Sequence, residues 1–169
     1  MQTHRIDVDF HLLLLKPFDT NPLYLCEGAG TLIGVAEDPE HLIVVTGCAS
    51  GPVRASLTAH LTSLGDAAPA TPSGVAAWEA VEEVSLPVSR PLFWSSADST
   101  LRPGDLPSEP AFVPAAPGPH RVRVSARGRN LAYDLVVAEP VEDYHLDVWP
   151  EPRLRDPEVL LRDRKPRSA

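Results

Sequence analysis

The stretch RIDVDFHLLLL, residues 5–15, decides the fold class, because apolar and polar residues alternate along most of its length. A period of two places successive side chains on opposite faces of an extended chain, as in a β-strand with one buried face. The face expected to be buried carries Ile6, Val8, Phe10, Leu12 and Leu14. The polar face carries Arg5, Asp7, Asp9 and His11. We therefore predict one half-buried strand over residues 5–15.

Further segments with β-branched or alternating residues predict more short strands. They are residues 31–36, 41–47, 52–61, 78–86, 91–94, 120–126 and 144–149. The first two of these form a hairpin, since Asp38-Pro39 between them favours a turn. Residues 78–86 also fit a helical turn, but Pro87 favours a strand that ends at Leu86. Residues 132–138 fit either one more strand or a covering loop.

Seven or eight short strands with almost no helix predict an all-β fold, an antiparallel β-sandwich or a small barrel-like pair of sheets. The chain has 19 prolines in 169 residues, about twice the usual content, and these disfavour long helices. We expect a single domain over residues 1–150 with mobile loops at 65–76 and 95–119. Residues 151–169 form a tail, in which Asp156 as N-cap and Pro157 predict a short helix.

The charge balance indicates what the protein binds. With 15 basic and 23 acidic residues the formal net charge is −8, which repels nucleic acid and anionic membranes and attracts a basic partner. No run of about 20 apolar residues is present to span a membrane. The N-terminal residues lack a secretory signal, so we expect a cytoplasmic protein with Cys26 and Cys48 reduced, although the two could pair. The oligomeric state stays open.

Four arginines crowd into HRVRVSARGRN, residues 120–130: Arg121, Arg123, Arg127 and Arg129. They could bind nucleic acid, bind a phosphate group, contact a protein partner, or form the solvent-exposed face of a strand. A nucleic-acid site would usually add stacking aromatic residues and a basic domain, and neither is present. We therefore expect the arginines to pair in water with carboxylates on neighbouring strands.

Carboxylates form the other distinctive group, at residues 7–9, 79–83 and 139–147. A pair of them could act as general acid and base, but with 23 acidic residues such pairs arise by chance. We expect a solvated acidic surface that speeds association with a basic protein. The residues predicted to contact that partner are Asp7, Asp9, Glu82, Glu83, Glu142, Asp143, Arg121 and Arg123.

No catalytic, cofactor or metal site is expected from the motifs. The histidines lie on separate segments, and neither cysteine has a second one at metal-binding spacing. CASG, residues 48–51, lacks the strand–turn–helix context of a nucleophile elbow. GAGTLIG, residues 28–34, matches a dinucleotide loop only superficially, because a β-like segment follows it rather than a helix.

Two parts of the sequence carry a resemblance. AAWEAVEEVSL (76–86), and GPHRVRVSARGRN (118–130) with EPVEDYHLDVWPEP (139–152), resemble a group of small bacterial β-proteins whose function is not assigned. More distantly, the alternating N-terminal strand with Asp and His and the late G-x-H-R-V-R turn are similar to competence protein J, a nuclease inhibitor, and to immunity proteins of toxin systems. The resemblance implies a β fold and an inhibitor-like role, but it supplies no contact residues.

These observations lead to one main expectation and two alternatives. The main one is a non-enzymatic, protein-binding β-sandwich, an immunity or inhibitor factor against a basic partner such as a nuclease toxin. The first alternative is a small ligand-binding or enzymatic sandwich with a site between the sheets, where polar groups converge on Trp78, Trp94 or His145. The second is a structural or oligomerisation module that uses the arginine strand and an exposed Trp149.

Overall fold

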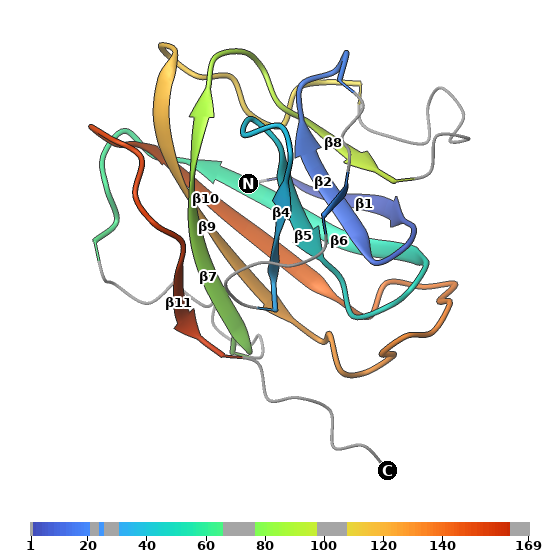
Figure 1. Cartoon of the computed structure of the whole chain (residues 1–169). Helices are drawn as coiled ribbons and strands as arrows, with labels where there is room; N and C mark the ends of the chain where they lie inside the picture. The colour runs from blue at the N-terminus through green and yellow to red at the C-terminus, as the bar shows by residue number, and fades with distance from the viewer. Residues whose placement is uncertain (1, 21–23, 26–30, 66–76, 98–107, 163–169) are drawn as a thin grey trace.

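The computed structural model describes residues 2–20, 24–25, 31–65, 77–97 and 108–162. These residues form an all-β protein with two sheets and no helix (Figure 1). The six-stranded sheet contains, in order, β1 (Thr3–Val8), β6 (Gly51–Ala59), β10 (Asp143–Pro150), β9 (Gly118–Arg127), β7 (Ala80–Val88) and β11 (Glu158–Leu161). The five-stranded sheet contains β3 (Tyr24–Leu25), β4 (Ile33–Ala36), β5 (Leu42–Val45), β2 (Leu12–Lys16) and β8 (Phe93–Ser96).

The single strand predicted over residues 5–15 is wrong. The chain reverses at Phe10 and His11, whose φ angles are 51° and 62°, and Leu12 N donates to Asp9 O at 3.0 Å. The residues before the turn form β1 of one sheet, and those after it form β2 of the other. The alternation failed because the four leucines of residues 12–15 are buried on both faces of a central strand, so their pattern has no polar side. Phe10, expected to be buried, is 71% exposed.

Other predicted strands are confirmed. β4 and β5 form the expected antiparallel hairpin, with Ile33 opposite Val44, and residues 78–86 contain most of β7. Residues 132–138 are a covering loop, apart from an isolated bridge between Ser50 and Val136. The expectation of antiparallel pairing alone is corrected by β6 and β10, which run parallel.

One apolar core contains residues of both sheets. The six-stranded sheet contributes inward side chains such as Ile6, Val122 and Leu146, and the five-stranded sheet contributes Leu13 and Val44. Figure 1 shows β4 and β5 in front of β9 and β10, which places this core between them. Full burial of each such side chain contributes about 1.5–3 kcal/mol relative to exposure.

The C-terminal segment pairs with a sheet instead of forming a helix. The helix predicted from Asp156 and Pro157 is replaced by β11, which pairs antiparallel with β7 (Figure 1). Residues 163–169 lie outside the described residues, as do 66–76 and 98–107 of the two loops predicted to be mobile. Within the described part of the chain, no helix has the length and apolarity to cross a membrane.

Candidate functional site

Three connections converge at one end of the protein: the β1–β2 turn (9–11), the β5–β6 connection (46–50) and the β9–β10 connection (128–142). Backbone hydrogen bonds join them. His11 N donates to Ala49 O at 3.0 Å, and Ala49 N donates to Leu135 O at 2.9 Å. Asp134 N donates to Gly47 O at 2.8 Å. We call the outer side of these connections the three-loop surface.

The three-loop surface exposes a group of apolar side chains, in contrast to the polar exterior expected from the sequence. They are Phe10, Leu131, Tyr133, Leu135 and Val136, each more than half exposed. The rings of His11 and Tyr133 lie 6.4 Å apart, which joins the β1–β2 turn to the β9–β10 connection. Apolar side chains that are exposed together on one side of a protein commonly mark a binding site.

Backbone strain gathers on the same surface. Among the described residues, three non-glycine residues have positive φ angles, and all of them lie here: Phe10, His11 and Asp134. The left-handed conformation costs an L-residue roughly 1–2 kcal/mol. Strained residues persist where the surrounding structure holds them, and they cluster at functional sites.

Buried groups hold the three loops from below. Glu142, fully buried, accepts hydrogen bonds from Gly47 N, Cys48 N and the Tyr144 hydroxyl. A Cβ on Gly47 would lie 1.9 Å from Arg129 O, so only glycine permits this close approach. Burial, together with nearby Glu142, raises the pKa of Cys48 to about 12 and that of Tyr144 well above its ordinary value, so both stay protonated. The loops are therefore preformed.

Carboxylates lie on the same connections and on the adjoining strand β1. Asp134 accepts from His11 Nε2 at 3.2 Å, and Asp9 accepts from Ser50 Oγ at 2.8 Å. Glu139 pairs with Arg5 at 2.8 Å, and Asp7 is exposed on β1. Asp7 and Asp9 are thus the predicted contact residues that lie beside the three-loop surface.

Glu82, another predicted contact residue, is buried and fixes one sheet to the other. Its carboxylate accepts hydrogen bonds of 2.9–3.0 Å from the successive backbone amides of Thr31, Leu32 and Ile33. Three successive backbone amides that bind one anionic group form an anion-binding nest, and here the bound group is a side chain of the same protein. Glu82 and Glu142 therefore have structural partners within the protein.

Glu83, Arg121 and Arg123 form a buried ion cluster on the outer face of the six-stranded sheet, the face away from the other sheet. Arg121 Nε lies 2.9 Å and Arg123 Nε 2.7 Å from the two oxygens of Glu83. The predicted pairing of arginine with cross-strand carboxylates is confirmed here. The predicted exposure of these arginines to water is wrong, since both side chains are 1% exposed.

The remaining arginines of the cluster also bind protein groups. Arg127 Nε lies 2.8 Å from Asp143 and its guanidinium lies over Trp78, while Arg129 Nη2 donates to Thr31 O. Hydrogen bonds from Arg54 and Arg127 outweigh burial, which acts in the opposite sense, and lower the pKa of Asp143 below its ordinary value.

A chain of polar side chains on this outer face includes a serine, a histidine and an aspartate. Ser56 Oγ lies 2.9 Å from His145 Nδ1, and His145 Nε2 lies 3.3 Å from Asp147, which also binds His60 Nε2 at 2.7 Å. Trp78 stacks on His145, so polar groups do converge there. Ser56, however, lies within β6 between two paired strands and is buried, so the chain joins β6 to β10 without presenting a nucleophile.

The structure corrects one further expectation. Trp149, expected to be exposed, is buried under the guanidinium of Arg123. Within the described ranges, no group of three or more His, Cys, Asp or Glu side chains is placed to hold a metal ion. Cys48 is a free, buried thiol. Cys26, the cysteine that could pair with it, lies outside the described residues.

Sequence reasoning missed the apolar side chains of the three-loop surface. Phe10 follows the alternation of Ile6 and Val8, and this pattern predicts a core position for it. In the segment NLAYDLVVA, residues 130–138, the turn-forming Asn130 precedes an apolar run and Asp134 interrupts it, and these two residues are the available signal for an exposed loop.

No protein-family model matches the chain, and comparison with curated proteins and with solved structures found no similar one. Within the described residues, the three-loop surface combines exposed aromatic rings, non-glycine residues with positive φ angles, and carboxylates.

Proposed function

We propose that this protein is a cytoplasmic, non-enzymatic β-sandwich that binds a basic protein through its three-loop surface, in the manner of an immunity or inhibitor factor. The observation that carries the proposal is the coincidence of exposed apolar side chains with the strained residues Phe10, His11 and Asp134. Exposed apolar side chains and strained backbone both lower the stability of the free protein. Contact with a partner would bury the apolar side chains and would explain why the strained residues are retained.

The geometry supports tight binding in two ways. The aromatic side chains of Phe10 and Tyr133 are the residue types that dominate binding energy at protein interfaces. The hydrogen bonds among the three loops and to Glu142 fix the surface before binding, so little conformational entropy is lost on association.

The charges favour a basic partner. Asp7, Asp9, Asp134 and Glu139 lie beside the apolar side chains, and Arg5 is paired with the last of them. The net charge of −8 adds a long-range attraction, which raises the association rate with a positively charged protein. Proteins that act on nucleic acid carry such positive surfaces, which is why a nuclease is the partner class we propose.

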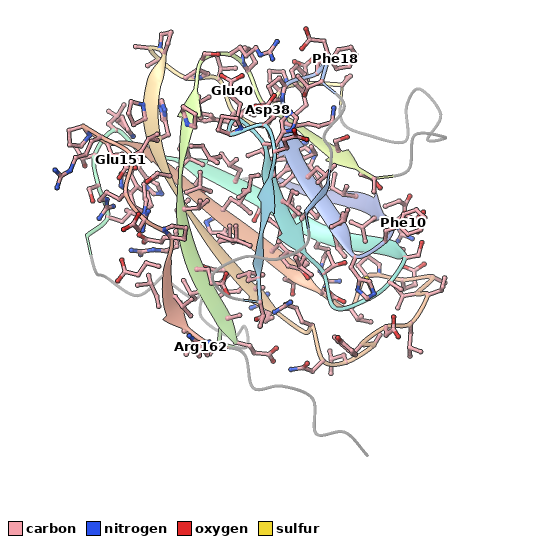
Figure 2. The ribbon with its side chains drawn as sticks, viewed as in Figure 1. Phe10, Phe18, Asp38, Glu40, Glu151 and Arg162 are labelled. Atoms are coloured by element: carbon pink, nitrogen blue, oxygen red, sulfur yellow. The ribbon has the colours of Figure 1, made fainter. Side chains whose placement is uncertain are left out.

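The test compares the protein with a surface variant as bait in extracts of its native cells. The variant is Phe10→Ser with Tyr133→Ser, and the control is Phe18→Ser. Phe18 is a suitable control because it is also an aromatic residue, its side chain is 80% exposed, and it lies far from Phe10 in Figure 2. We expect the unchanged bait and the control to recover the same basic protein at about 0.05 M salt and to lose much of it at about 0.5 M.

The purified partner then gives the quantitative outcome. Loss of two aromatic anchors should weaken the dissociation constant by at least about 30-fold, and the control should change it by less than about 3-fold. The proposal fails if the surface variant binds as tightly as the unchanged protein, or if neither bait recovers a basic protein at low salt.

A further inference from the structure

Strand β1 forms one edge of the six-stranded sheet and has a hydrogen-bonded neighbour on one side. It pairs with β6, and no other described strand pairs with it. Strand β8 of the other sheet lies near β1 but is bonded to β2 instead. Figure 1 shows β1 and β11 on opposite sides of the molecule, at the two ends of their sheet. An edge strand carries unpaired amides and carbonyls that can bind another chain.

The register with β6 shows which residues of β1 carry these unpaired groups. Arg54 N, in β6, donates to Glu142 O, so the backbone groups of Arg54 face β10 and point away from β1. Arg54 lies opposite Arg5, and two residues opposite each other in an antiparallel pair either both face each other's strand or both face away. The N–H and C=O of Arg5 therefore point to the open edge. Those of Thr3 and Asp7, two residues before and after it, do the same.

The edge at β1 lacks the features that usually protect a sheet edge. Proteins protect such edges with short strands, lysine, proline or β-bulges. Among the edge strands in the described part of the chain, β1 has six residues, β8 and β11 have four, and β3 has two. β1 contains neither lysine nor proline, and its register with β6 is continuous, whereas that of β11 with β7 shifts. β1 is therefore the edge most open to a further strand.

The sequence of β1 is complementary to itself in one antiparallel register. Two copies related by a two-fold axis pair their β1 strands antiparallel, with the outward-facing residues opposite one another. When the axis passes through Ile6, Arg5 of each copy lies opposite Asp7 of the other. Each of these two pairs exchanges two backbone hydrogen bonds. Their side chains extend from the exposed face of the strand, and opposite charges in such cross-strand pairs are stabilising.

Neighbouring registers bring like charges together. With the axis at Arg5, the two copies of Arg5 lie opposite each other, and with the axis at Asp7 the two copies of Asp7 do. Like charges directly opposite each other destabilise a sheet. The charges of β1 therefore favour the register centred on Ile6.

The side chains of this register are accessible. Arg5 Nη1 binds Glu139 at 2.8 Å and Nη2 donates to Ala138 O at 2.9 Å, which orients the guanidinium group and leaves Nε without a partner among the described residues. The Arg5 side chain is 51% exposed. Asp7 is exposed as well, and its carboxylate accepts no hydrogen bond within the part of the chain that the structure describes. Arg5 Nε can therefore donate to Asp7 of a second copy.

We propose that β1 is a self-association surface, at which two copies of this chain pair their β1 strands antiparallel about Ile6 and join two six-stranded sheets into one. The inference goes beyond the proposed function, because β1 is not part of the three-loop surface. Phe10 follows Ile6 by four residues, roughly 13 Å along a strand, so the three-loop surface of each copy stays at an outer end of the junction.

Sedimentation equilibrium of the full chain at about 5–500 µM measures the association. One pair of strands buries less than the roughly 1,200 Å² of a stable interface, so we expect a dimer that dissociates on dilution, with a dissociation constant below about 200 µM. Amide hydrogen exchange locates the contact. The amides of Arg5 and Asp7 should exchange at least about 2-fold more slowly at the highest concentration than at the lowest, and the amide of Glu37, in the β4–β5 turn, should not change.

Two charge variants test the register. Arg5→Asp places two carboxylates opposite each other in each pair, and Asp7→Arg places two guanidinium groups there, so each variant alone should dimerise at least about 10-fold more weakly. Mixed in equal amounts, the two variants restore an acid opposite a base in both pairs and should form a heterodimer about as tight as the unchanged dimer. Their net charges are −10 and −6, two units on either side of −8, so the heterodimer carries the same total charge as the unchanged dimer.

Two controls separate this contact from other effects. Glu37→Arg makes the same change of charge as Asp7→Arg at an exposed residue away from β1, and it should alter the dissociation constant by less than about 3-fold. Phe10→Ser with Tyr133→Ser should dimerise as the unchanged protein does, so this inference and the proposed function can fail separately.

The proposal is overturned if the unchanged protein remains a monomer at about 500 µM, or if it dimerises while the amides of Arg5 and Asp7 stay unprotected. It is also overturned if the two folded charge variants form no heterodimer when mixed. If either charge variant does not fold, amide exchange in the unchanged protein decides.

Discussion

At the scale of single residues, buried carboxylates join segments that lie far apart in the sequence. Glu82 holds the backbone of residues 31–33, Glu142 holds that of residues 47–48, and Glu83 holds two guanidinium groups of β9. An ionised carboxylate inside a protein needs such partners, because burial without them is very unfavourable. Each of these glutamates therefore favours a single arrangement of its neighbours.

Loss of Glu83 should strongly destabilise the protein. In Glu83→Ala two buried guanidinium groups lose their shared carboxylate, and we expect the free energy of unfolding to fall by about 3–5 kcal/mol. Glu37→Ala, at an exposed glutamate of the β4–β5 turn, is the control and should stay within about 0.5 kcal/mol. Urea unfolding measures both, and equal losses in the two variants would contradict the prediction.

At the scale of elements, the β1–β2 turn determines where the chain passes from one sheet to the other. Two-residue turns with positive φ favour Asn-Gly, and the sequence here has Phe10-His11 instead. The turn therefore left no signal, whereas Asp38-Pro39 correctly predicted the β4–β5 hairpin. The parallel pairing of β6 with β10 could not be predicted either, since it joins segments almost ninety positions apart, such as Ser56 and His145.

Replacing Phe10 with a residue suited to its backbone should separate stability from binding. Asn tolerates the left-handed conformation, so Phe10→Asn should raise the free energy of unfolding by about 0.5–1 kcal/mol, because the exposed ring has little packing to lose. The same variant should weaken partner binding at least about 10-fold. Phe18→Asn should give no stabilisation, since Phe18 has no positive φ to relieve.

Urea unfolding and binding measurements on the two variants provide the comparison. Stabilisation without loss of binding would remove Phe10 from the proposed contact. Destabilisation by Phe10→Asn would show that the ring, despite its exposure, contributes packing that outweighs the strain.

At the scale of the whole molecule, the all-β class and most strand positions could be predicted, because alternation and turn residues are local signals. The candidate site could not be predicted from the sequence. In a chain with 23 acidic residues, composition assigned the carboxylates to the surface, although three of those predicted to contact a partner are buried. Burial depends on which strands become neighbours, and that information lies in long-range contacts.

The stability of the whole protein should fall in acid. Burial alone would raise the pKa of Asp143 and of Asp147, but hydrogen bonds from Arg54 and Arg127, and from His145 and His60, lower both. Their contribution is present above the unfolded value of about 3.9 and is lost as the pH falls through the lower folded values.

Asp143→Asn tests this assignment. At pH 7 we expect the variant to lose about 1–2 kcal/mol of unfolding free energy, a range that allows for the partial exposure of Arg54. Below about pH 4 the difference from the unchanged protein should shrink, since both then lack the charge. Urea unfolding at several pH values measures the difference in unfolding free energy between the two proteins. If that difference stays constant as the pH falls below about 4, the charge of Asp143 is not its source.

The position of β11 has a consequence for the integrity of the chain. This strand covers the hydrogen-bonding edge of β7, and Asp156, just before it, accepts from Arg121. The link from β10, residues 151–157, is mostly exposed and therefore open to proteolysis. One cleavage there would release the strand, leave a row of unpaired amides along β7, and make each cut molecule a template for strand exchange with its neighbours.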